Sequence, residues 1–121
     1  MHIVNRLFGL VAILLIVLSG SSCRRNDFRT HKIRVPGLKN ERCVEIVQNA
    51  IVRYTQQPSM DGSIKLDRIK FDEGEQSVVI EYDSMKVALK NLEHLIAATG
   101  FAANDIPADS NAMTRLPPEC R

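Results

Sequence analysis

The stretch Val35-Pro36-Gly37-Leu38-Lys39-Asn40-Glu41-Arg42-Cys43 decides the fold. Apolar and basic residues alternate over positions 32–35, which is the period of a half-buried strand. Pro36 and Gly37 end that strand. Asn40 can then cap a helix, because its side-chain oxygen accepts from a backbone N–H one turn later. The stretch therefore predicts a strand, a tight turn and a helix that carries Cys43 in its first turn.

The rest of the chain continues the alternation of strands and helices. Apolar residues recur at spacings of three and four after Cys43, which is one face of a helix. A loop follows, then two strands that form a hairpin, a second helix that Asp83-Ser84 caps, and a short last strand. The predicted segments after the first helix are Gln56–Ser63 for the loop, Asp67–Phe71 and Ser77–Tyr82 for the hairpin, Met85–Gly100 for the second helix and Phe101–Ala103 for the last strand. The alternation of apolar residues changes phase between Leu66 and Ile69, so the first hairpin strand either starts near Asp67 or carries a bulge.

The order β-α-β-β-α-β predicts an α+β, ferredoxin-like fold. We expect a four-stranded antiparallel sheet with both helices on one face. Ile46, Val47, Ile51, Val79, Leu92, Leu95 and Ile96 should be mostly buried.

The run from Val79 to Asp83, followed by Val87, Leu92, Ile96 and Gly100-Phe101, resembles the heavy-metal-associated domain family over about Lys32 to Asn104. That family has a metal loop of the form Gly-Met-x-Cys-x-x-Cys. Gly37 matches its glycine and Cys43 its second cysteine, whereas Leu38 replaces the Met and Asn40 replaces the first cysteine. The resemblance implies that Phe101 shields the loop, although a plain core role for this aromatic fits the sequence equally.

One thiolate is too few for a soft cation such as Cu(I), so Cys43 needs a second donor. Cys120 is the best candidate, because the segment from Ala103 onward is long enough to fold back. The same reach permits a Cys43–Cys120 disulfide, which is common in an oxidising compartment. A second copy of Cys43 across a dimer is another source of a thiolate, and Cys43 could also be only a small buried hydrophobe. His31 and His94 are predicted not to be ligands.

The first 22 residues predict a signal peptide, because Arg6 precedes an apolar run too short to cross a membrane. Small residues lead to Cys23, which resembles a bacterial lipoprotein signal and makes Cys23 the predicted lipidation site. Ordinary secretion, with Cys23 as a leftover thiol, is the alternative. The predicted organisation is 1–22 signal peptide, 23–30 tether, 31–104 heavy-metal-associated-like domain and 105–121 extended C-terminal arm.

Composition narrows the function. The 121 residues carry 16 basic and 14 acidic side chains, a balance that does not predict a nucleic-acid partner. No catalytic constellation stands out, so we do not expect an enzyme. The prediction is an extracytoplasmic, membrane-anchored protein of the periplasm or cell envelope that binds a soft metal, Cu(I) or Zn(II), and meets a metal-transport partner. The alternative is a structural or binding lipoprotein that binds no metal. The sequence specifies no oligomeric state.

Overall fold

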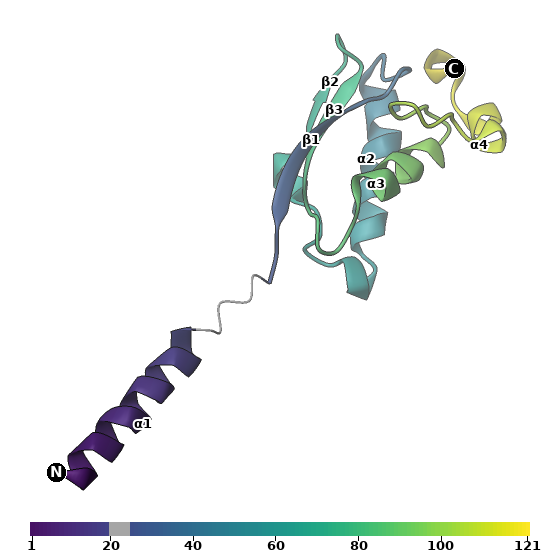
Figure 1. Cartoon of the computed structure of the whole chain (residues 1–121). Helices are drawn as coiled ribbons and strands as arrows, with labels where there is room; N and C mark the ends of the chain where they lie inside the picture. Colours follow the sequence, from purple (N-terminus) through teal and green to yellow (C-terminus); the bar gives the residue numbers. More distant parts are fainter. Residues whose placement is uncertain (20–24) are drawn as a thin grey trace.

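The computed structural model describes residues 1–19 and 25–121, with side chains for 1–13 and 25–121. Cys23, the predicted lipidation site, and the end of the predicted signal peptide lie outside these residues. Figure 1 labels the α-helices and strands: α1 His2–Ser19, β1 Phe28–Arg34, α2 Glu41–Thr55, β2 Lys70–Asp72, β3 Ser77–Asp83, α3 Leu89–Ala97 and α4 Ser110–Arg115. Within the described residues, three 3-10 turns lie between or after them: η1 Pro58–Met60, η2 Leu66–Arg68 and η3 Pro118–Cys120.

Helix α1 coincides with the apolar run at the N-terminus. Its apolar side chains up to Ile13 are exposed, among them Ile3, Leu7 and Phe8. Among the described helices, none combines the length and the apolar character that a membrane crossing requires.

The sheet has three antiparallel strands in the order β1-β3-β2, with α2 and α3 on one face (Figure 1). Strand β3 is central, and its register pairs Ile33 of β1 with Val78. Alternate residues of the strands point towards the helices, because side chains alternate across a sheet. The core therefore joins one face of the sheet to the apolar stripes of α2 and α3, and its largest fully buried apolar side chains are Phe101, Ile33, Leu38, Ile51, Ile80, Leu92, Ile96, Val35, Val47 and Val78.

Of the seven residues predicted to be mostly buried, four are fully buried and three are only partly buried. Val47, Ile51, Leu92 and Ile96 are fully buried. The other three are only partly buried: Ile46, Val79 and Leu95. Helices cover only one face of the sheet, so Val79 and Glu81 of the central strand are only partly buried.

The predicted fourth strand at Phe101–Ala103 is absent from the described sheet, which corrects the four-stranded expectation. Ala103 instead forms an isolated bridge with Ile106. Asn104 between them has φ of 51°, in the left-handed region, so the chain turns sharply instead of continuing beside β1. Only one rung remains. The N–H of Asn104 donates to the carbonyl of Arg34 at 2.7 Å, and the Arg34 N–H donates to Asn104 Oδ1 at 2.9 Å.

The second helix also starts later than predicted. Asp83-Ser84 does not cap α3, which begins at Leu89 after a turn. The carboxylate of Asp83 is 1% exposed, and its Oδ1 accepts from the backbone N–H of Met85 at 3.0 Å. Asp83 therefore closes the turn between β3 and α3, which is the alternative that short polar side chains offer to helix capping.

The predicted extended arm, 105–121, is wrong: this segment folds onto the domain. Asp109 caps α4 by accepting from the N–H of Ala112 at 2.9 Å. Ala112, Leu116 and Cys120 are all buried at intervals of four residues. A Cβ placed on Gly100 would lie 2.9 Å from the backbone of α4, so the glycine permits this close packing. These buried residues at a regular spacing, two of which have small side chains, hold the segment against the domain.

Candidate functional site

The turn after β1 contacts two other segments of the chain, at Gln76 and at Phe101. Gly37 has φ of 110°, which favours glycine, and its N–H donates to Gln76 Oε1 at 2.8 Å. A Cβ at this position would lie 2.9 Å from Cδ1 of Phe101. Phe101 is 2% exposed and packs against the turn, which fits both the shielding role that the resemblance implies and a plain core role. Leu38, at the position of the family Met, is fully buried.

The first turn of α2 presents Cys43 in the position that the sequence predicts. Asn40 has extended backbone, and its Oδ1 accepts from the Cys43 N–H at 3.2 Å. The same oxygen lies 3.3 Å from Cys43 Sγ. The side chain at the place of the family's first cysteine is therefore a helix cap. Cys43 itself is fully buried.

A disulfide joins Cys43 to Cys120, which lies 77 residues further along the chain. Their Cα atoms are 5.7 Å apart, within the range that a disulfide can bridge. The structure thus brings together the two cysteines that the sequence singled out. Of the alternatives that the sequence offered, the structure contains the Cys43–Cys120 disulfide. The sulfur partner of Cys43 therefore belongs to the same chain and not to a second copy.

Polar contacts hold the C-terminal residues over the start of α2. Arg42 and Glu119 form an ion pair at 3.4 Å, and Lys39 Nζ donates to the carbonyl of Arg121 at 3.0 Å. Arg121 Nε in turn donates to the carbonyl of Leu116 at 3.1 Å. The charged side chains near the disulfide are therefore mixed: Lys39, Arg42 and Arg121 are basic, whereas Glu41 and Glu119 are acidic. The sequence shows charged residues beside each cysteine. It does not show that they contact one another, because the two cysteines lie 77 residues apart.

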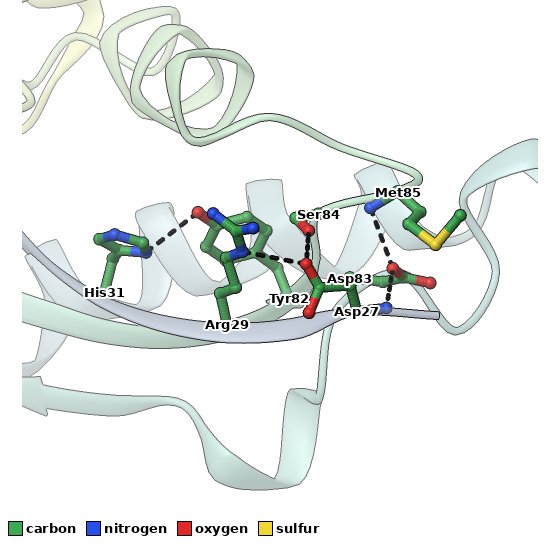
Figure 2. A network of polar contacts seen from close by, with 7 residues as sticks. All are labelled: Asp27, Arg29, His31, Tyr82, Asp83, Ser84 and Met85. Atoms are coloured by element: carbon green, nitrogen blue, oxygen red, sulfur yellow. Dashed lines mark hydrogen bonds and ion pairs between the residues drawn. The ribbon is translucent and has the colours of Figure 1, made fainter. Parts of the chain in front are cut away.

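Neither histidine considered as a ligand lies at the disulfide. His31 is in β1, where its Nδ1 is 3.0 Å from the Tyr82 hydroxyl (Figure 2). Burial raises the pKa of that hydroxyl. His94 is exposed on α3. Across residues 1–19 and 25–121, no group of three or more His, Cys, Asp or Glu side chains is arranged to hold a metal ion.

A second polar network, drawn in Figure 2, fixes the start of β1. Asp27 Oδ2 accepts from Ser84 Oγ at 2.8 Å and from Arg29 Nε at 3.1 Å. The Asp27 N–H donates to the buried Asp83 carboxylate at 2.9 Å. Asp27 and Arg29 lie within the predicted 23–30 tether, so these contacts bind the end of that segment to the turn after β3. Strand β1 accordingly begins at Phe28, earlier than the predicted start of the domain at residue 31. The evident role of these contacts is to anchor the strand, because each donor is matched to an acceptor.

The comparisons with known proteins support the fold. No protein-family model matches the chain, and no curated protein matches it. Among solved structures it is similar to the solution structure of the "putative copper-ion-binding protein from Bacillus anthracis str. Ames", with 19% sequence identity and a TM-score of 0.53. The match covers 65% of this chain and 99% of that one. At this identity the likeness shows a shared α+β architecture, here with a three-stranded sheet.

Proposed function

We propose that the protein binds a soft metal ion as cargo through Cys43 and Cys120 in their reduced state. One observation carries the proposal: two cysteines 77 residues apart meet at the start of α2, directly after the turn that ends β1. This is where the resembled family holds its metal. Cys120 would supply in space the thiolate that Asn40 cannot supply in sequence. The copper-ion-binding description of the similar solved structure agrees with this assignment.

The donor set decides which metal fits. A disulfide offers no thiolate, so a dithiol reductant must first transfer two electrons and two protons, leaving two thiols here and a disulfide on the reductant. Two thiolates suit Cu(I), which prefers soft ligands, whereas structural Zn(II) sites usually have four protein ligands. The described residues provide no third or fourth donor. Cu(I) is therefore the proposed cargo, rather than Zn(II).

The surroundings favour the thiolate form once the disulfide opens. Cys43 lies in the first turn of α2, where the helix dipole stabilises negative charge. Lys39 and Arg42 precede it and Arg121 follows Cys120, three basic side chains against the acidic Glu41 and Glu119. A Cu(I) ion held by two thiolates carries a net negative charge, which these basic side chains would offset.

The proposed setting is extracytoplasmic and membrane-anchored, in the periplasm or cell envelope, with Cys23 carrying the lipid. The apolar N-terminal run and the small residues before Cys23 support this location. In an oxidising compartment the disulfide would be the resting form, and a metal-transport protein would be the partner for the reduced form. The proposed role is carriage rather than catalysis.

A second candidate is a structural or binding lipoprotein in which the disulfide is permanent. Burial favours it, because Cys43 is 0% and Cys120 is 3% exposed. A buried disulfide is poorly accessible to a reductant or to a metal donor. The domain would then use the fold without its metal chemistry.

A Cu(I) titration of the full chain against a competing chromophoric chelator separates the two candidates. The starting protein is Cys23→Ser, so that Cys43 and Cys120 supply the only thiols. When reduced, it should bind one equivalent of Cu(I); when oxidised, none. Cys120→Ser should abolish tight binding, and adding Asn40→Cys should restore it by rebuilding the family loop. If the fully reduced protein binds no Cu(I), the metal proposal fails and the structural candidate stands.

A further inference from the structure

The outer edge of β1 is open over most of its length. Strand β1 lies at one side of the sheet, with β3 as its neighbour (Figure 1). On the other side, among residues 1–19 and 25–121, only Arg34 at the end of the strand has a backbone partner, Asn104. The chain turns away at that point, where a ferredoxin-like fold would continue as a fourth strand. The edge that such a strand would cover is left to solvent.

The direction of the backbone groups follows from the register. In an antiparallel pair, consecutive residues point their N–H and C=O groups alternately towards the partner strand and away from it. Val35 donates to Gln76 on the β3 side, whereas Arg34 bonds to Asn104 on the opposite side. Phe28, Thr30 and Lys32 share the parity of Arg34, so their N–H and C=O groups face the open edge. Within the described chain, no hydrogen-bond partner for these six groups is found.

The charge of the edge restricts what can pair with it. Strand β1 reads Phe-Arg-Thr-His-Lys-Ile-Arg and contains no acidic residue. Arg29 and Lys32 have nearby acidic partners, Asp27 at 3.1 Å and Glu75 at 2.6 Å, while Arg34 is exposed. A second copy of β1 would place basic side chains opposite basic side chains, which is destabilising. Basic residues on an edge strand are a known device against pairing between identical chains.

We propose that the edge of β1 binds an extended acidic segment of a partner protein, which adds to the sheet as its fourth strand. The backbone of Phe28, Thr30 and Lys32 would supply the hydrogen bonds, and the basic side chains would select acidic residues. This is the β-augmentation mode of peptide recognition. The rung between Arg34 and Asn104 marks where the added strand would end. The site is independent of the disulfide and of the proposed metal.

The test uses the full chain, isotopically labelled and held in detergent micelles. The probe is a capped synthetic peptide, Thr-Glu-Val-Glu-Val-Glu-Thr, titrated to about 1 mM, where even weak pairing of this kind is measurable. The backbone amide signals of Phe28, Thr30 and Lys32 should shift together, and their hydrogen exchange should slow. A peptide with Lys in place of Glu should bind at least tenfold more weakly.

Thr30→Pro tests the edge itself. Proline removes an outward N–H and places its ring on the open side, without removing a bond to β3, and edge strands tolerate it. We expect at least a tenfold loss of peptide affinity, whereas the matched control Thr30→Ala should bind like the parent. If the proline variant does not fold, an acidic peptide N-methylated at alternate amides makes the same test, since it cannot complete the ladder on the methylated side.

Three results would overturn the proposal. The first is no amide shift in β1 with the acidic peptide. The second is affinity unchanged by both Thr30→Pro and N-methylation, which would mean that only charge is recognised. The third is a concentration-dependent dimer, seen by sedimentation and lost in Thr30→Pro, which would assign the edge to a second copy of the chain.

Discussion

Reducing the Cys43–Cys120 disulfide should cost this domain a large part of its stability. The bond closes a loop with a sequence separation of 77 residues. In the chain-entropy account, a loop of this size restricts the unfolded chain enough to stabilise the fold by about 4.5 kcal/mol at 25 °C. Small domains are usually stable by only about 5–15 kcal/mol in total. Reduction should therefore leave the domain close to unfolding, although no folded-state contact other than the S–S bond has been removed.

Urea unfolding, followed by far-ultraviolet circular dichroism with and without a phosphine reductant, measures this effect. The Cys23→Ser protein is used to prevent disulfide exchange with a third thiol. With a typical urea dependence of about 1–3 kcal/mol per molar, the midpoint should fall by at least about 1.5 M. The Cys120→Ala variant is the matched control, because its midpoint should be low and should not respond to the reductant.

The reasoning is refuted if both thiols are shown by titration to be free and the midpoint is unchanged. That result would mean that the contacts of α4 and the Arg42–Glu119 pair hold the C-terminal segment without the covalent bond. A fall of less than about 1 kcal/mol would be too small for the entropy model, and would indicate residual structure in the reduced unfolded chain.

Three further predictions concern the core, the surface charges and the N-terminus. Leu92→Ala, at a fully buried position, should lower the free energy of unfolding by about 2–5 kcal/mol in urea, whereas Leu66→Ala, at a position 42% exposed, should change it far less. The Lys90 ammonium lowers the pKa of the Asp105 carboxyl, so the pair stabilises the fold above the unfolded-state pKa of Asp105, and this stabilisation disappears as the pH falls through the lower folded-state pKa. Asp105→Asn should therefore slightly lower the free energy of unfolding at pH 7 and leave it unchanged at acid pH. An equal loss at both pH values would contradict the assignment. Cys23→Ser should release the protein from membranes, as cell fractionation would show, and a mature N-terminus without lipid would contradict the predicted anchor.

The sequence predicts best those elements whose signals are local. The helical period after Cys43, the Asn40 cap and the β-branched strand around Ile80 all appear in the structure close to where they were expected. Each of these features depends only on residues that are a few positions apart in the sequence. The second helix was predicted to end at Gly100; α3 ends at Ala97, and Gly100 follows with φ of 106°, the backbone conformation that glycine often supplies after a helix.

The features that the sequence missed depend on packing between distant segments. Phe101–Ala103 has the composition of a strand, but the left-handed turn at Asn104 diverts the chain after a single rung. The C-terminal segment has few large apolar residues, yet the backbone of α4 packs closely on Gly100, and Ala112 and Leu116 are buried. Neither outcome follows from local composition, since both depend on which distant part of the chain packs against the segment.

Placing the second cysteine in the C-terminal segment links the proposed metal site to the folding of that segment. In a Cys-x-x-Cys loop, both thiolates belong to one turn and remain together if the rest of the chain loosens. Here Cys120 approaches Cys43 only while α4 packs on Gly100 and Leu116 stays buried. A ligand that binds only the docked form stabilises docking in proportion to its affinity. A bound cation would therefore replace the disulfide as the bond that holds the segment, and release of the cation into a reducing environment would loosen the same segment.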